Sequence, residues 1–232
     1  MNDRPFALTV RWSESAGEVE GLLLRPDDAR WLMVLAHGAG AGMHHPFMEG
    51  LAQVLAGCGI ATLRYQFPYM QQRRRRPDAS GVLIATVETA VGAACRTAAD
   101  LPLLAGGKSL GGRMTSLACA GKRSAVNPDM ALVRGLVLFG FPLHPAGRPG
   151  TGRAEHLSTV QVPMLFLQGT RDPLADLDLL RPVCAELAPR ATLHVVAGAD
   201  HSFHMLKRSG RTDRDVLNEL ARTVASWAEA LS

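Results

Sequence analysis

A serine flanked by glycines lies near the middle of the chain, in the run Gly107–Gly111 (GKSLG). Such a run is informative where it joins a strand to a helix, because the tight turn then lifts the serine hydroxyl clear of the sheet. The residues Leu101–Ala105 have the composition of a buried strand, and an amphipathic helical pattern follows the serine. We therefore expect Ser109 to be the nucleophile of an acyl-transfer reaction.

Two loops later in the chain supply the groups that such a serine needs. A serine hydroxyl is a weak nucleophile until a base takes its proton, and a carboxylate commonly orients that base. Asp172 follows the strand-like run Met164–Gln168, and His201 follows the run Leu193–Val196. The order serine, acid, histidine and the position of both groups after strands predict that Asp172 and His201 complete a triad with Ser109.

Two other residues are alternatives for these roles. Asp200 is a carboxylate next to His201, but a sequence neighbour cannot easily reach beneath the histidine ring, which favours Asp172 as the acid. His37 also follows a strand-like run. Because the base comes last in the expected order, we expect the His37 ring to brace its loop instead.

The loop that begins at His37 is rich in glycine and alanine. Small residues allow backbone N–H groups to approach a substrate carbonyl, and a loop after an early strand commonly supplies one donor to the oxyanion. We expect this donor to be the Ala39 N–H, with Gly38 as the alternative. The second expected donor is the Leu110 N–H, directly after the serine, where the start of a helix favours negative charge.

Candidates for substrate contacts lie beside these groups or in loops after strands; they are Gly38, Phe67, Tyr69, Lys108, Leu143 and His144. The aromatic and loop residues among them could equally pack their own loops. The Lys108 side chain is expected to point away from the position of the carbonyl. The run Arg73–Arg76 either holds an anionic group of the substrate or is solvated, as most charged runs are.

The elements that must position these residues alternate between short apolar runs and longer amphipathic ones. The strand-like runs are Ala7–Trp12, Val19–Arg25, Trp31–Ala36, Ile60–Tyr65, Leu101–Ala105, Gly135–Gly140, Met164–Gln168 and Leu193–Val196. The helix-like runs are Phe47–Gly57, Gly81–Ala98, Ser109–Ala120, Leu177–Ala188 and Thr212–Leu231, with Thr212 as an N-cap.

This alternation predicts one α/β domain over residues 1–232, with a mostly parallel sheet covered by helices on both faces. The segment between Gly140 and Met164 is rich in proline and glycine and leaves room for a loop and one short helix. We therefore expect a minimal cap or none, and an open site.

Composition agrees with a globular enzyme: of 232 residues, 47% are hydrophobic and 20% are charged, with a net charge of +4. Basic residues are not interleaved with aromatic ones, and no apolar run is long enough for a membrane span, so neither nucleic acid nor a membrane is an expected partner. The four cysteines show no metal-ligand spacing, and no motif implies a cofactor. We expect a cytoplasmic protein with reduced thiols, and a homodimer is left open.

Three stretches carry a family resemblance: His37–Met48 (HGAGAGMHHPFM), Arg64–Tyr69 (RYQFPY) and Phe141–Pro145 (FPLHP). With the serine elbow, they resemble the α/β-hydrolase superfamily near the dienelactone hydrolases. More narrowly, they are similar to a family of bacterial hydrolases marked by HGAGxxMxxPFM and related to a regulatory subunit of a chromatin-modifying complex. The resemblance implies the α/β-hydrolase fold and the triad, but no substrate. Dienelactone hydrolases use a cysteine nucleophile, and Ser109 departs from that pattern.

Two functions of different classes follow. The first is a serine hydrolase that cleaves a small-molecule ester or thioester through an acyl-enzyme on Ser109. The second is a binding or scaffold protein that keeps the fold without turnover. The intact set of three triad residues favours the hydrolase, because a scaffold has no need to keep all three groups.

Overall fold

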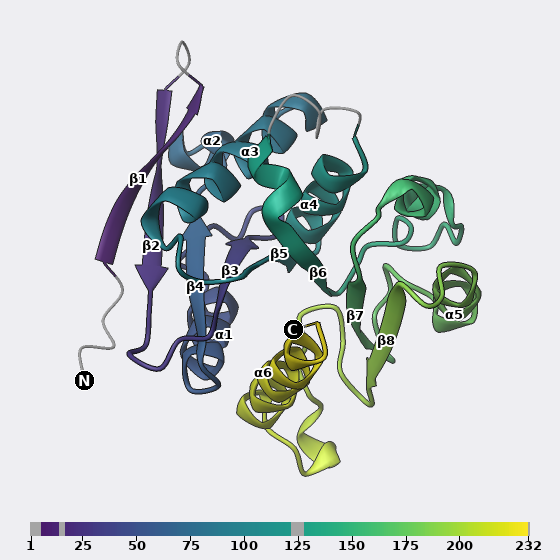
Figure 1. Cartoon of the computed structure of the whole chain (residues 1–232). Helices are drawn as coiled ribbons and strands as arrows, with labels where there is room; N and C mark the ends of the chain where they lie inside the picture. Colours follow the sequence, from purple (N-terminus) through teal and green to yellow (C-terminus); the bar gives the residue numbers. More distant parts are fainter. Residues whose placement is uncertain (1–5, 14–16, 122–127, 232) are drawn as a thin grey trace.

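The computed structural model describes residues 6–13, 17–121 and 128–231, and in this part of the chain eight strands form one sheet (Figure 1). The strands are β1 (Phe6–Ser13), β2 (Gly17–Leu24), β3 (Trp31–Ala36), β4 (Ile60–Tyr65), β5 (Leu103–Lys108), β6 (Val133–Phe139), β7 (Met164–Gly169) and β8 (Ala191–Val196). Their order across the sheet is β1-β2-β4-β3-β5-β6-β7-β8. Strands β1 and β2 are antiparallel to their neighbours, and β4 to β8 pair in parallel.

Helices cover both faces of the sheet, which confirms the predicted fold class (Figure 1). They are α1 (Pro46–Ala56), α2 (Pro68–Gln71), α3 (Ser80–Thr97), α4 (Leu110–Ala120), α5 (Leu177–Glu186) and α6 (Asp213–Glu229). Helices α1 and α6 contact each other on one face, and α3 and α4 contact each other on the opposite face. Thr212 caps α6 as predicted: its hydroxyl accepts the Asp215 N–H, and the Asp215 carboxylate accepts the Thr212 N–H.

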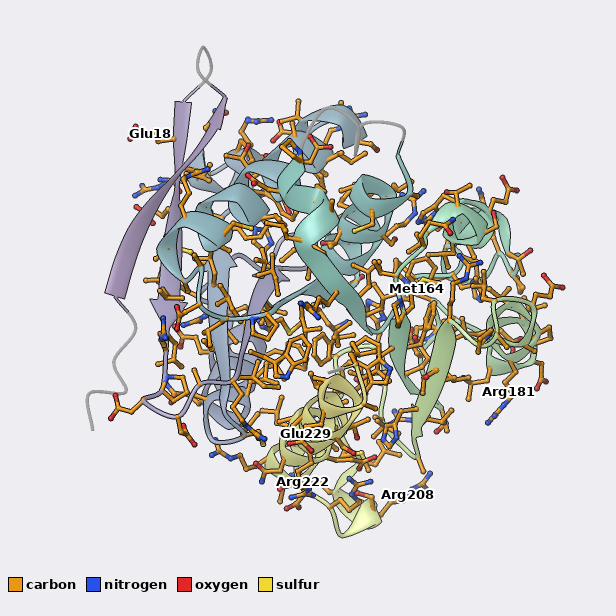
Figure 2. The ribbon with its side chains drawn as sticks, viewed as in Figure 1. Glu18, Met164, Arg181, Arg208, Arg222 and Glu229 are labelled. Carbon is orange, nitrogen blue, oxygen red and sulfur yellow. The ribbon has the colours of Figure 1, made fainter. Side chains whose placement is uncertain are left out.

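The central strands are buried on both sides and supply the core of each layer. Along β3, Leu32, Val34 and Ala36 belong to one hydrophobic cluster, whereas Trp31 and the other alternate residues belong to the cluster beneath α1 and α6. This is the two-residue period of a strand covered on both faces. Figure 2 shows the side chains that fill both layers, with Arg181 of α5 and Arg222 of α6 at the outside of the molecule.

Strand β5 differs from its prediction in a way that matters for the site. The sequence places this strand at Leu101–Ala105, but the structure extends it through two glycines to Lys108. A side chain on Gly106 would overlap the Val137 carbonyl of β6, and one on Gly107 would overlap the Ala36 carbonyl of β3. Close packing between strands therefore requires these glycines, and the chain turns only after Lys108.

The segment between β6 and β7 is short, as expected. Its helical part is a 3-10 helix at Gly152–Thr159 (η3), which contacts α4. The remaining 3-10 turns of the described chain are Pro128–Leu132 (η2) and Lys207–Ser209 (η4). None of the helices in the described residues has the length and apolar character needed to cross a bilayer.

Candidate active site

Ser109 occupies the turn between β5 and α4 in a strained backbone conformation, with φ +50° and ψ −113°. The chain holds this turn through two backbone hydrogen bonds, one from the Ser109 N–H to the Phe139 carbonyl and one from the Arg113 N–H to the Ser109 carbonyl, both 3.0 Å long. A Cβ on Gly111 would lie 2.5 Å from the Ala36 carbonyl oxygen. The second glycine of the motif is therefore needed for α4 to start this close to β3.

Three side chains from separate loops form a continuous hydrogen-bonded path. The Ser109 Oγ lies 2.9 Å from His201 Nε2, and His201 Nδ1 lies 2.7 Å from the Asp172 Oδ2. Because a carboxylate can only accept, Nδ1 carries the proton and Nε2 is free to accept the serine hydroxyl. The Asp172 side chain is fully buried, whereas the His201 side chain is 22% exposed.

Both oxygens of Asp172 have further partners, which a buried carboxylate needs. The Gln168 Nε2 donates to Oδ2 at 2.5 Å, and the Leu174 N–H donates to Oδ1 at 2.8 Å. These bonds fix the carboxylate below the His201 ring.

Asp200, the alternative acid, has a different position and task. Its Oδ1 accepts the N–H groups of Ser202 and His204, at 2.8 and 2.9 Å. It thus shapes the turn that carries His201, while Asp172 contacts the ring itself.

The loop after β3 is braced by the Phe67 backbone and the Tyr69 side chain, which follow β4. The His37 Nδ1–H donates to the Gly38 carbonyl at 2.7 Å, and the Phe67 N–H donates to His37 Nε2 at 3.1 Å. Burial lowers the pKa of His37 to about 4, so the ring is neutral. The Tyr69 hydroxyl accepts the Gly40 N–H at 3.0 Å. As expected, His37 stabilises the loop and takes no part in the hydrogen-bonded path.

This bracing leaves two backbone donors near the serine. Within the described residues, neither the Ala39 N–H nor the Leu110 N–H has a hydrogen-bond partner. Leu110 is the first residue of α4, and Ala39 is exposed at the bend of the braced loop. Unpaired N–H groups at a helix start and a small-residue loop are the usual donors to a developing oxyanion.

A cavity of about 340 Å³ opens beside Ser109. Its lining consists of Gly38, Ala39, Ala41, His45, Phe47, Met48, Lys108, Ser109, Leu174, His201 and Ser202. The apolar side chains of Phe47, Met48 and Leu174 were not among the residues predicted from the sequence to contact substrate. The signal for two of them was present, because Phe47 and Met48 end the His37–Met48 stretch.

The structure does not bring several expected substrate contacts to this cavity. Phe67, Tyr69 and Leu143 are fully buried and belong to the hydrophobic core. His144 is also buried, where its Nε2 accepts the Asp176 N–H at 3.0 Å. These residues pack or brace their loops, which was the alternative for each of them.

The charged candidates also present no charged group to the open cavity. The Lys108 stem lines it, but the Lys108 Nζ is buried. Arg73–Arg76 are exposed, and none of them lines the cavity. Arg74 pairs with Asp78 at 2.5 Å.

A second, larger hollow lies at the opposite ends of the central strands. It measures about 500 Å³, and its lining includes Trp31 of β3, Leu103 of β5, Arg134 of β6 and the exposed Leu132. Its one acid, Asp100, is bound by Arg25 at 2.5 and 3.0 Å. This hollow contains no serine or histidine, and across the described residues no three His, Cys, Asp or Glu side chains gather as metal ligands.

Comparisons with known proteins agree with this fold. A family model described as "Alpha/beta hydrolase domain" matches residues 29–229. The structure resembles a dienelactone hydrolase from Anabaena variabilis (22% identity, TM-score 0.74, covering 98% of this chain and 97% of that one). It also resembles a lid-less α/β serine hydrolase from Xanthomonas campestris (20% identity, TM-score 0.72, covering 97% and 95%). At these identities the likeness shows the fold alone.

One curated relative has a name that describes a transferase and not a hydrolase. A putative phosphoribosyl transferase from Mycobacterium tuberculosis is 29% identical over 213 residues, which is 90% of this chain. The match covers only 43% of that relative, so the chain spans less than half of its length.

Proposed function

Because the chain belongs to the alpha/beta hydrolase domain family, we propose that it is a serine hydrolase that cleaves carboxylic esters or thioesters through an acyl-enzyme on Ser109. The observation that carries the proposal is the hydrogen-bonded path from the Ser109 hydroxyl through His201 to the buried Asp172 carboxylate. This is the arrangement that activates a serine for nucleophilic attack.

In the proposed first step, His201 Nε2 takes the hydroxyl proton while the Ser109 Oγ attacks the substrate carbonyl carbon. The carbonyl oxygen becomes an oxyanion and accepts the N–H groups of Ala39 and Leu110. The C–O or C–S bond then breaks, and the imidazolium gives its proton to the leaving alcohol or thiol. Asp172 stabilises the imidazolium during this step and remains a carboxylate.

Deacylation repeats the sequence with water as the nucleophile. His201 takes a proton from the water as its oxygen attacks the acyl carbon, and the proton then returns to the Ser109 Oγ as the acid leaves. The 22% exposure of the His201 side chain supports this step, because water can reach the ring.

The lining of the cavity supports a short, uncharged acyl group. Phe47, Met48 and Leu174 supply apolar surface, and a volume of about 340 Å³ is at the small end for ligand pockets. The name of the mycobacterial relative does not alter the proposal, because that name describes a whole protein of which the match covers only 43%.

The proposal is tested with a fluorophosphonate probe, which labels activated serines. Wild-type protein should be labelled and should hydrolyse p-nitrophenyl acetate and butyrate. Ser109→Ala should abolish labelling, and His201→Ala should reduce it strongly. Ser202→Ala is the matched control: this serine lines the same cavity, and its removal should leave labelling unchanged.

Two outcomes would overturn the proposal. One is labelling that survives in Ser109→Ala. The other is a folded wild-type protein that neither reacts with the probe nor turns over any acyl substrate, which would favour the binding or scaffold role.

A further inference from the structure

Lys108 is a buried lysine that the proposed reaction does not use. It ends β5, directly before Ser109, and only 8% of the residue is exposed. Its Nζ is buried and has no hydrogen-bond partner among the described residues. An ammonium group in such a position is costly unless nearby charges or dipoles stabilise it. Its surroundings therefore indicate what holds it there.

The ammonium lies on the acid–base side of the site. A Cβ built on Gly140 would lie 3.0 Å from the Lys108 Nζ and 3.5 Å from both the Asp172 Oδ2 and the His201 Nδ1. The three polar atoms therefore all lie within 3.5 Å of one point, the position that a Cβ on residue 140 would occupy. Gly140, with φ +63°, leaves that space open.

The other neighbours of the ammonium come from the His201 loop. The Nζ lies 5.6 Å from the centre of the Phe203 ring, within the range of a cation–π contact. Phe203 is buried, with φ +62°, and its ring stacks on Phe47 of the cavity wall. Asp200, in the same loop, adds a second negative charge beside the first from Asp172.

We propose that Lys108 is a positioning residue of the triad: its ammonium is a fixed positive charge beside the Asp172–His201 pair that keeps the imidazole unprotonated between turnovers. The inference rests on the proposed function, and it assigns Lys108 a role other than substrate contact.

The need for such a charge follows from the roles of the two neighbours. The Asp172 carboxylate attracts a proton to His201, yet the ring can act as a base only while its Nε2 is free. A cation near the same Gly140 position as Nδ1 opposes that protonation, and the same cation favours the ionised form of Asp172.

The state of the lysine itself is compatible with this role. Burial lowers the pKa of Lys108 to about 8, while Asp172 and Asp200 act in the opposite direction. The ammonium is therefore largely charged at neutral pH. The titratable groups around it are Asp172, Asp200 and His201, and His45 lines the same cavity.

The experiment compares wild type with Lys108→Met, which keeps the length of the side chain and removes the charge. The acid limb of kcat/KM should move to higher pH by about one unit, the scale of one charge at this range in a partly buried site. The pH at which the His201 ring takes up a proton, followed by NMR, should move in the same direction without any need for turnover. Lys207→Met is the control, because Lys207 is exposed on η4 and should change neither.

A merely structural role for Lys108 predicts lower kcat with an unmoved acid limb and an unmoved His201 titration, and that result would overturn the inference. If Lys108→Met does not fold, the wild-type protein still tests whether Lys108 and His201 are coupled. The His201 resonances should show a second step in the pH range in which the Lys108 ammonium loses its proton, and a single step would refute the coupling.

The NMR arm separates the two proposals. A shifted His201 titration in a protein without hydrolase activity would retain the role of Lys108 and reject the reaction. Hydrolysis by the wild-type protein, together with an unshifted acid limb and an unshifted His201 titration in Lys108→Met, would retain the reaction and reject the role of Lys108.

Discussion

The two hollows at opposite ends of the parallel strands both have apolar walls, but they differ in volume and in the polar side chains that line them. The larger one, about 500 Å³, lies where β3, β5 and β6 begin, and its one carboxylate is paired with Arg25. The smaller one, about 340 Å³, lies where β3 and β5 end, and the hydrogen-bonded path of Ser109 reaches it. Volume alone would select the end whose lining contains no serine or histidine.

Strand direction explains the difference. Where parallel strands end, their connecting loops leave the sheet at one edge, so loops far apart in sequence bring their side chains together there. Ser109, Asp172 and His201 follow β5, β7 and β8 in this way. The starts of the same strands are entered from the ends of helices and turns, and there the sheet presents mainly packing side chains.

The two ends should differ most when one carboxylate is removed from each. Asp172→Asn should lower kcat/KM about 10³- to 10⁴-fold, because an amide neither fixes the His201 tautomer nor stabilises the imidazolium. Asp100→Asn should leave kcat/KM within about twofold, since its hollow takes no part in the reaction. Ester hydrolysis by both purified variants provides the measurement, and equal losses would refute the assignment of the site.

Mild acid should also affect the two ends differently, through their contributions to the free energy of unfolding. His37 has a pKa of about 4 in the fold and an ordinary value near 6.5 in the unfolded chain, so the unfolded state binds the extra proton as pH falls below 6.5. The stability that depends on neutral His37 is complete above that value and decreases toward pH 4. Between pH 7 and pH 5 this loss is about 2 kcal/mol.

Asp100, at the other end, does not respond in that window. Its hydrogen bond to Arg25 lowers the pKa of Asp100. Any stability that ionised Asp100 contributes is therefore complete at every pH above its pKa in the unfolded chain, and it is lost only as the pH falls below that value. Urea unfolding at pH 7 and pH 5 tests the difference. Burial also lowers the pKa of His156 to about 4, so His37→Gln should keep part of the pH dependence but less than wild type. An unchanged dependence in His37→Gln would contradict the prediction.

The smallest expected effect comes from filling each hollow with the same side chain. Ala41→Trp should reduce the volume beside Ser109 and lower kcat/KM for p-nitrophenyl hexanoate about tenfold relative to the acetate, because the longer acyl group loses its space. Ala99→Trp, in the opposite hollow, should leave the ratio of the two substrates unchanged. If Ala99→Trp alone changed chain-length preference, the acyl group would have to bind at the other end.

Sequence alone predicted the positions that depend on local chemistry. The turn at Ser109 and the N-cap at Thr212 each follow from residue types within a few positions of each other, and Asp172 and His201 were each identified by the strand-like run before them. It could not predict contacts made across the sheet. Phe67 and Tyr69 follow a strand, as residues at a rim do, yet they are buried.

The glycines of β5 show the same limit. Gly106 and Gly107 are usually indicators of a turn, but here they belong to a strand because Val137 and Ala36 approach too closely for side chains. The carbonyls that exclude those side chains come from strands on either side. The strand at this position therefore depends on close packing against β3 and β6, and the local sequence of β5 does not predict it.

The separation of Ser109 from His201 in the chain has a consequence for synthesis. The two residues that share the reactive hydrogen bond are 92 positions apart, and β8 and the turn at Asp200 must form before the ring reaches the hydroxyl. A nascent chain on the ribosome therefore contains Ser109 long before it contains His201, the residue that activates it in the proposed reaction. In that reaction, a serine-directed probe should label only chains that have been synthesised beyond β8 and have folded there.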